Sequence, residues 1–445
     1  MTRLVVLLAG AALLITLPAS ARVGRNAAFL GLARPTALAL VDTNGDGKTE
    51  IVSANARLSM SVFSAAGDGS FTRGAVTALA GSHPDMATAD FNKDGVPDYA
   101  VATYEGAVQV LLGRAGGGFA AVTRQSSDMQ TIAVLAADFD GDGNTDVAGL
   151  SAKTGRLTVS LGNGDGSFRS ASRYLVGGDP WEIATADLNG DGRLDVLATR
   201  GLPDELRVVF GTAGGGFSAP RVFRIGDLPT GIATGDFNGD GKTDVAVTSF
   251  GGKAITILLG DGAGNFRATS EVRALDSPDS IVAADLTGDG KLDLAAATFL
   301  GPTKVAVLKG NGDGTFAPAT LYALGGGAFD LEAADLNKDG KLDLVGALAY
   351  TGHVSVLLGQ GGGSFAAPVR YAAGAPACVV PDIRGAKLAA AKRALRAGGC
   401  RLGRVRSAYS TLVPRGRVLA QARGRGTEMP FGSHVGVTVS KGRKH

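Results

Sequence analysis

An aspartate-rich stretch of nine residues recurs seven times, with side-chain oxygens at positions 1, 3, 5 and 9. The fifth copy, residues 236–244, reads DFNGDGKTD. A hard divalent cation takes six to eight oxygen ligands at about 2.3–2.6 Å, and a tightly turned loop of alternating carboxylates can supply them. Position 6 is glycine in every copy, which permits the positive φ that bends the chain around an ion. The stretch therefore predicts a calcium loop.

Up to seven structural calcium ions are expected. Position 7 has no constant side chain and is expected to contribute only its backbone carbonyl oxygen. The predicted ligands are Asp42, Asn44, Asp46, Lys48, Glu50; Asp90, Asn92, Asp94, Val96, Asp98; Asp138, Asp140, Asp142, Asn144, Asp146; Asp187, Asn189, Asp191, Arg193, Asp195; Asp236, Asn238, Asp240, Lys242, Asp244; Asp285, Thr287, Asp289, Lys291, Asp293; and Asp335, Asn337, Asp339, Lys341, Asp343.

Two other interpretations of the stretch can be weighed. An EF-hand needs a glutamate at position 12, whereas Val247 and Gly149 stand there in the fifth and third copies. A Gly/Asn/Asp hairpin turn without metal is the remaining alternative. Seven copies in phase favour the metal loop over that turn.

The elements around each loop have the length of β-strands. The copies begin 48, 48, 49, 49, 49 and 50 residues apart, which indicates a repeat architecture. In the fifth repeat, strands are expected at 232–236, 244–249, 254–259 and 266–275. Four strands per repeat are typical of a propeller blade. The sequence predicts an all-β fold, a seven-bladed β-propeller of four-stranded blades within residues 22–374.

A glycine-rich turn precedes the fourth strand of each repeat, and a phenylalanine follows it. We expect these phenylalanines to pack between neighbouring sheets. They are Phe71, Phe119, Phe168, Phe217, Phe266, Phe316 and Phe365.

The repeats resemble the FG-GAP/VCBS family, which also forms the head of integrin α chains. The segments Phe316-Ala-Pro318 and Phe365-Ala-Ala-Pro368 are similar to a sequence motif of that family. The resemblance implies calcium at the matching loop positions and a role in adhesion or ligand display. Glu50 replaces aspartate at position 9 of the first copy, and Thr287 replaces Asn/Asp at position 3 of the sixth. We expect these two loops to bind calcium more weakly.

Strand direction places the calcium loops and the glycine turns at one rim and the other connections at the opposite rim. By analogy with the family, that opposite rim is the ligand face. Its aromatic side chains are the candidates for ligand contact, and the alternative is that they only pack the loops. They are Tyr104, Trp181, Phe250, Phe299 and Tyr350.

A basic module follows at residues 378–442, with a basic tail at 443–445. Residues 377–445 hold 15 Lys/Arg and 2 Asp/Glu, a net charge of +13, which leaves −10 for the remainder. The Val-Pro-Asp opening, a helical pattern over 387–397 and the Val-Thr-Val-Ser ending resemble a PASTA domain, a small α+β fold. The family is linked to peptidoglycan, although a spacer and a merely solvated basic face remain alternatives.

The chain has two cysteines, Cys378 and Cys400, which bracket the expected helix. In an exported chain an even pair predicts a disulfide.

Residues 1–21 have the pattern of a secretory signal peptide: a charged start, an apolar run and Ala-Ser-Ala at 19–21. A retained N-terminal anchor is the alternative. No further transmembrane segment is expected after cleavage, and export argues against nucleic acid as a partner. The protein is expected to be secreted or extracellular, in association with the cell wall.

Residues that could carry out catalysis are sparse. The four histidines lack zinc-ligand spacing, and no nucleophile elbow or phosphate loop occurs. We expect no enzyme activity, but an exported calcium-binding propeller that recognises an extracellular protein or glycan. The alternatives are a polysaccharide lyase or hydrolase on the propeller scaffold and a spacer without a ligand.

Overall fold

The structure is a computed structural model, and it describes residues 7–8, 11–12, 34–56, 59–79, 85–273, 275–300, 303–348, 351–373, 378–379, 381–397, 400–423, 428–429 and 434–443. The chain divides into two units, residues 1–30 and 31–445. In the first unit, β1 (Leu7–Leu8) pairs antiparallel with β2 (Ala11–Ala12). Most of the expected signal peptide lies outside the described residues. Among the helices described, none has the length and hydropathy needed to cross a membrane.

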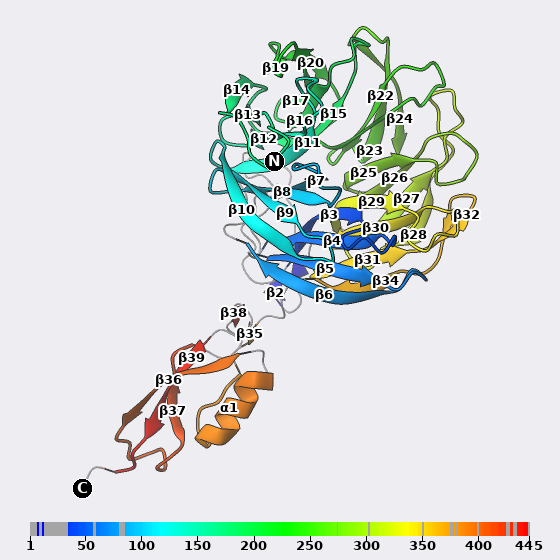
Figure 1. The fold of residues 1–445 in the computed structure, drawn as a ribbon. Helices are drawn as coiled ribbons and strands as arrows, with labels where there is room; N and C mark the ends of the chain where they lie inside the picture. The colour runs from blue at the N-terminus through cyan, green and yellow to red at the C-terminus, as the bar shows by residue number, and fades with distance from the viewer. Residues whose placement is uncertain are drawn as a thin grey trace. The chain divides into compact units, whose positions relative to one another are not determined.

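Within the described part of the second unit, seven four-stranded antiparallel sheets follow one another along the chain. Each sheet is a blade of a β-propeller, as the repeat length predicts, and Figure 1 shows the blades arranged in a ring. Blade 1 holds β3 (Pro35–Val41), β4 (Glu50–Asn55), β5 (Ser59–Ala65) and β6 (Phe71–Ala78). Blade 2 holds β7 (Met86–Ala89), β8 (Asp98–Thr103), β9 (Ala107–Gly113) and β10 (Phe119–Ser126). Blade 3 holds β11 (Thr131–Ala137), β12 (Asp146–Ser151), β13 (Arg156–Ser160) and β14 (Ser172–Leu175).

The remaining four blades follow the same order. Blade 4 holds β15 (Pro180–Ala186), β16 (Asp195–Gly201), β17 (Asp204–Val209) and β20 (Arg221–Arg224). Blade 5 holds β21 (Pro229–Gly235), β22 (Asp244–Ser249), β23 (Ala254–Gly260) and β24 (Phe266–Arg273). Blade 6 holds β25 (Pro278–Ala284), β26 (Asp293–Thr298), β27 (Lys304–Leu308) and β28 (Thr320–Ala323). Blade 7 holds β29 (Ala328–Ala334), β30 (Asp343–Leu348), β31 (His353–Leu357) and β34 (Val369–Ala372). Two glycine turns contain small hairpins, β18 (Gly211–Thr212) with β19 (Gly216–Phe217) and β32 (Gly359–Gly361) with β33 (Ser364–Phe365).

Burial changes from the inner to the outer strand of a blade. Every residue of β22 and β26 is buried, which explains their near-continuous runs of small and apolar side chains. In the outermost strand β28, by contrast, three of the four residues are exposed. The second strand of a blade is therefore packed on both faces by the neighbouring blades.

The hydrophobic core is divided among the interfaces between blades. Each of the seven interfaces has its own buried cluster in the described residues, including the interface between blades 7 and 1. There, Leu38 and Phe63 of blade 1 pack with Val345 and Val354 of blade 7. The first strands of successive blades contact one another around the ring, and β29 contacts β3. No strand is exchanged between the first and last of these sheets, so side chains close the ring, through packing and through hydrogen bonds such as that from Leu38 N to Asp330.

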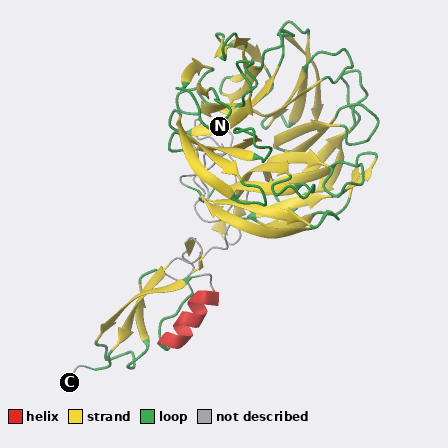
Figure 2. Ribbon diagram, viewed as in Figure 1, coloured by secondary structure: helices red, strands yellow, loops and turns green. Residues whose placement is uncertain are grey.

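The C-terminal module has a separate core. Its helix α1 (Leu388–Ala397), red in Figure 2, buries Ala391 and Leu395. Strands β36 (Arg401–Ala408), β39 (His434–Ser440) and β37 (Val418–Gln421) form a three-stranded sheet in that order. β35 (Cys378–Val379) pairs with β38 (Glu428–Met429). The small α+β fold expected from the sequence is confirmed.

Candidate metal loops

Each aspartate-rich loop connects the first strand of a blade to the second. In blade 5, β21 ends at Gly235 and β22 begins at Asp244, so the loop occupies the end of the strand that lines the centre of the ring. Since all seven first strands have the same direction relative to their blades, the loops gather at one rim of the propeller.

The first aspartate of each loop organises the turn through the backbone. In loop five, one carboxylate oxygen of Asp236 accepts hydrogen bonds from the N–H groups of Gly239 at 2.7 Å and Asp240 at 3.2 Å. The other oxygen accepts one from the N–H of Gly241 at 2.8 Å. The bond between positions 1 and 6 occurs in all seven loops. The chain's own hydrogen bonds thus hold each loop in a closed turn.

Both position 4 and position 6 of the loop adopt a positive φ. In loop five, Gly239 has φ +75° and Gly241 has φ +77°. Two loops place a lysine at position 4, Lys93 at φ 58° and Lys338 at φ 60°. The left-handed region costs a residue with a Cβ atom about 1–2 kcal/mol, so these two loops carry strain that glycine avoids in the other five.

Replacing Lys338 with glycine is expected to stabilise the protein by roughly 0.5–1 kcal/mol. Relief of the strain exceeds the added backbone entropy of glycine in the unfolded chain, which costs about 0.5–1 kcal/mol. The matched reverse change, Gly239→Lys in loop five, should destabilise the protein by a similar amount. Guanidinium unfolding in EDTA measures both variants, and a loss of stability in Lys338→Gly would contradict this explanation.

Position 9 connects the loop to the rest of its blade. Asp244 is fully buried, and its two oxygens accept hydrogen bonds from Phe237 N at 2.9 Å and Gly260 N at 2.8 Å. The aspartates at this position in loops two to seven each accept one bond from the start of their own loop and one from a glycine at the end of the third strand. A carboxylate has about four lone-pair sites, so two remain for a metal ion.

Burial raises the pKa of these six aspartates, that of Asp146 to about 6, and neighbouring loop carboxylates add to the effect in most of them. Their hydrogen bonds to backbone N–H groups oppose the shift without cancelling it. A bound divalent cation would stabilise the ionised form. The donor set therefore suits a cation electrostatically.

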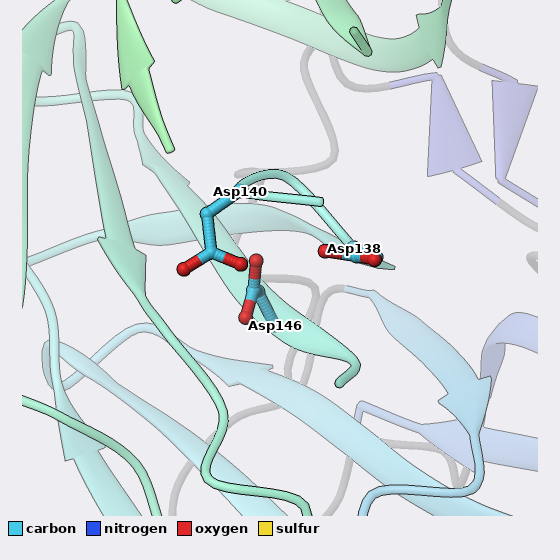
Figure 3. Close-up of side chains that lie close together, drawn as sticks. All are labelled: Asp138, Asp140 and Asp146. Carbon is cyan, nitrogen blue, oxygen red and sulfur yellow. The ribbon is translucent and has the colours of Figure 1, made fainter. Parts of the chain in front are cut away.

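Loop three brings three carboxylates together. Asp138, Asp140 and Asp146 each offer an oxygen, and these oxygens all lie within 4.8 Å of one another (Figure 3). Among the described residues, no other group of three histidine, cysteine, aspartate or glutamate side chains meets that distance. Loop three alone has aspartate at position 3, whereas the other loops have asparagine or threonine. The oxygen-only donors and their convergence fit a hard cation.

Basic side chains lie beside several position 5 carboxylates. Lys242 is 3.5 Å from Asp240, and equivalent pairs join Lys48 to Asp46, Arg193 to Asp191 and Lys341 to Asp339. Position 7 is asparagine in loop three, where Arg169 reaches Asp140 at 3.1 Å and Asp142 at 2.7 Å instead. Such exposed pairs contribute little to stability, because water and salt screen them. Sequence reasoning treated position 7 as a backbone ligand only and missed this charge pairing.

The glycine turns lie at the same rim as the loops and connect neighbouring blades. Gly314 in blade 6 donates its N–H to the carbonyl oxygen of Phe237 in loop five at 2.9 Å. The rings of Phe237 and Phe316 also meet edge to face, with centroids 5.7 Å apart. The pairs Phe91–Phe168 and Phe139–Phe217 repeat this contact. A loop of one blade therefore supports the turn of the next.

The aromatic candidates on the opposite rim lie in different surroundings. Phe299 is buried and packs on Phe329, with ring centroids 5.1 Å apart. Tyr104 packs against the core between blades 3 and 4, and Trp181 and Phe250 are partly buried. Tyr350 lies outside the described residues. The ligand role of these five side chains stays a prediction.

Of the predicted disulfide, only Cys400 is described at the level of its side chain, which is buried. The backbone of Cys378 belongs to β35, but its side chain lies outside the described residues. The disulfide stays a prediction.

Comparison with solved structures identifies the same fold in other proteins. A putative 6-phosphogluconolactonase from Bacteroides fragilis is 16% identical, with a TM-score of 0.56 over 75% of this chain and 94% of that chain. BBS1N, solved in complex with ARL6DN, is 12% identical, with a TM-score of 0.53 over 73% of this chain and 91% of that chain. At such identities the likeness shows the fold alone.

A curated relative matches a small part of the chain. A probable serine/threonine-protein kinase of Clostridium perfringens (strain 13 / Type A) is 40% identical over 65 residues, which are 15% of this chain and 10% of the kinase. The chain spans about a tenth of that relative's length, so the match does not carry the kinase's activity to this protein.

Family models match both parts of the protein. The FG-GAP-like repeat model matches residues 42–101, 90–149, 138–198, 187–247, 236–296 and 285–346. Together these stretches contain all seven loops and well over half of the chain. The PASTA domain model matches residues 379–441. The chain belongs to the FG-GAP-like repeat family and carries a PASTA domain at residues 379–441.

Proposed function

We propose that the protein is an exported, calcium-stabilised binding protein without enzyme activity. Its propeller recognises an extracellular protein or glycan, and its PASTA domain attaches it to cell-wall peptidoglycan. The observation that carries the calcium role is the convergence of Asp138, Asp140 and Asp146 in a turn that recurs seven times in phase. The same three positions, with Asp142, would hold the ion in loop three.

The metal role is structural. The loops lie where blades meet. Position 9 ties loops two to seven to their own blades, and a glycine turn of the next blade donates a hydrogen bond to loops two, four, five and six. A cation that neutralises the loop carboxylates removes their mutual repulsion and stabilises these connections. The ligand face is then left to the opposite rim, away from the ions.

The PASTA domain supports the wall-binding part of the proposal. Modules of this type are associated with peptidoglycan-like or peptide ligands. Arg404 and Arg406 are exposed on β36, and the segment from residue 377 onward has a net charge of +13. This charge favours anionic wall polymers over neutral glycans.

Binding of the full-length protein to purified sacculi tests this proposal. Wild type should sediment with sacculi at low ionic strength, and the double variant Arg404→Glu/Arg406→Glu should lose at least several-fold in affinity. The matched control, Arg267→Glu/Arg273→Glu, makes the same charge change on exposed β24 of the propeller. Equal binding by both variants, or no binding by wild type, would rule out wall attachment through this module.

A further inference from the structure

Loop three carries one carboxylate more than the other loops. It has aspartate at positions 1, 3, 5 and 9, whereas the other six loops have asparagine or threonine at position 3. Its position 7 is Asn144, which brings no positive charge. Carboxylates held in one turn repel one another unless a cation lies among them. In the structure the positive charge comes from Arg169, which follows the glycine turn of the same blade.

Backbone hydrogen bonds fix Arg169 in relation to loop three. Its N–H donates to the carbonyl oxygen of Leu161 at 2.8 Å, which closes the base of the glycine turn. The N–H of Gly162, the neighbour of Leu161, donates to the buried carboxylate of Asp146 at 2.7 Å. Asp146 is position 9 of loop three, so the loop and the turn that carries Arg169 share one anchor in the blade.

The guanidinium group of Arg169 binds the carboxylate oxygens that the backbone leaves free. Asp140 Oδ1 accepts a hydrogen bond from Asp142 N at 3.2 Å, and Asp142 Oδ1 accepts one from Asn144 N at 2.8 Å. Arg169 Nη1 donates to Asp140 Oδ2 at 3.1 Å, and Nη2 donates to Asp142 Oδ2 at 2.7 Å. One planar fork of donors therefore bridges positions 3 and 5. A calcium ion held by the same two positions needs the same oxygens.

The pair between Arg169 and Asp140 is less exposed than the ion pairs of the other loops. The Asp140 side chain is 7% exposed, against 28% to 42% for the paired aspartates at position 5 of loops one, four, five and seven. The glycine turn of blade 4 covers it, since a Cβ atom added to Gly215 would lie 3.3 Å from the Cβ atom of Asp140. Asp140 directs its carboxylate toward Asp146 (Figure 3). Water screens this pair less than the others.

We propose that Arg169 sets the calcium affinity of loop three by competing with the ion for Asp140 and Asp142. The proposal rests on the calcium role proposed above for the loops. To bind, calcium displaces the guanidinium group from the two Oδ2 atoms, and the fixed positive charge of Arg169 repels the arriving divalent ion. Loop three is therefore neutralised from within when calcium is scarce. It fills at a higher calcium concentration than its carboxylates alone would require.

Loop three can be observed separately from the other loops by NMR. Labelling glycine with ¹³C at the carbonyl carbon and asparagine with ¹⁵N selects the peptide bonds of Gly–Asn pairs. The sequence has four such pairs, at residues 143–144, 162–163, 264–265 and 310–311, and only the first lies in an aspartate-rich loop. The N–H of Asn144 donates to Asp142, so its signal should move when an ion binds. The variant Asn144→Ser removes this signal and thereby assigns it.

Calcium titration of the full-length protein, followed at the Asn144 signal, tests the proposal. In Arg169→Gln the midpoint should lie several-fold below that of wild type, because the competing charge is gone. Arg169→Lys keeps the charge but loses the fork, so its midpoint should lie between the two. The matched control is Arg267→Gln. Arg267 follows Phe266 as Arg169 follows Phe168, and it makes no ion pair within the described residues, so its midpoint should equal that of wild type.

The possible outcomes separate this proposal from the calcium role itself. If calcium moves the Asn144 signal in both proteins, an equal or higher midpoint in Arg169→Gln would overturn the competition and leave calcium in the loop. If calcium moves the signal in neither protein, loop three binds no calcium, and the role of Arg169 falls with it.

Thermal melts distinguish competition from a purely structural role of Arg169. In EDTA, Arg169→Gln should melt below wild type, because the loop loses the charge that pairs with Asp140 and Asp142. Millimolar calcium should then raise the melting temperature of the variant by more than that of wild type, because a tighter site stabilises the folded state more. A residue that only holds the turn in place would give equal increments, and that result would contradict the competition.

Discussion

Chelation of calcium is expected to lower the melting temperature of the full-length protein far more than any single loop substitution does. A site with the affinity of extracellular calcium modules, at tenfold saturation, contributes about 1.4 kcal/mol. Seven such sites would contribute on the order of 10 kcal/mol, which is comparable to the stability of a whole domain. The loss should appear as a fall on the order of 10 to 20 °C in a thermal melt with EDTA.

The control for this experiment is EDTA neutralised with excess calcium, which should restore the melt. Asp240→Asn is the matched single change, because it removes one exposed carboxylate from one loop of seven. With calcium present, the melting temperature of this variant should lie below that of wild type by only a small fraction of the decrease that EDTA causes, because the neighbouring blades still pack. A melt that EDTA leaves unchanged would show that the loops are folded turns without a stabilising ion.

Asp244→Ala is expected to destabilise the protein by about 2–3 kcal/mol even when EDTA is present. The substitution leaves two buried N–H groups, those of Phe237 and Gly260, without an acceptor. Each unsatisfied group costs about 1–3 kcal/mol, and relief of the buried charge offsets part of that cost. Guanidinium unfolding in EDTA measures the loss independently of any metal.

Two further variants serve as comparisons for Asp244→Ala. Asp244→Asn retains one acceptor oxygen and should lose about half as much stability as Asp244→Ala. Asp240→Ala removes an exposed carboxylate of the same loop and should cost much less stability than Asp244→Ala in EDTA. Equal losses in Asp244→Ala and Asp240→Ala under these conditions would contradict the structural role of position 9.

The repeat period made most of the fold predictable. A spacing of 48 to 50 residues with four strand-length runs per repeat predicts a seven-bladed propeller, and the structure confirms it. The expectation that the phenylalanines after the glycine turns pack between sheets is confirmed at Phe168, Phe217 and Phe316. These features are local in sequence and are repeated, so they can be read without knowing which blades touch.

The contacts that close the ring between the first and last blades could not be predicted from the sequence of the repeats. Ring closure depends on contacts such as Leu38 N with Asp330 and Phe71 N with the hydroxyl of Tyr371, which join residues about 300 positions apart. Tyr371 also stacks edge to face on Phe63 and Phe71. Nothing in one repeat indicates that its outer strand will meet the first blade.

The sequence predicts the chemistry of the candidate site, but it does not predict the different structural roles of the loop aspartates. The sequence places oxygens at positions 1, 3, 5 and 9 alike, whereas in the structure Asp244 is buried against the backbone and Asp240 is exposed. The strain at Lys338 also depends on a φ value that the residue type does not reveal.

The calcium content of the folded full-length protein at equilibrium tests the central claim most directly. In equilibrium dialysis against millimolar calcium, we predict several bound calcium ions per chain in excess of the calcium in the buffer. The loop variant Asp236→Asn/Asp240→Asn keeps the shape of both side chains but removes two negative charges, and it should bind about one calcium ion fewer. A folded protein that takes up no calcium at millimolar concentration would contradict the account of these loops as metal sites.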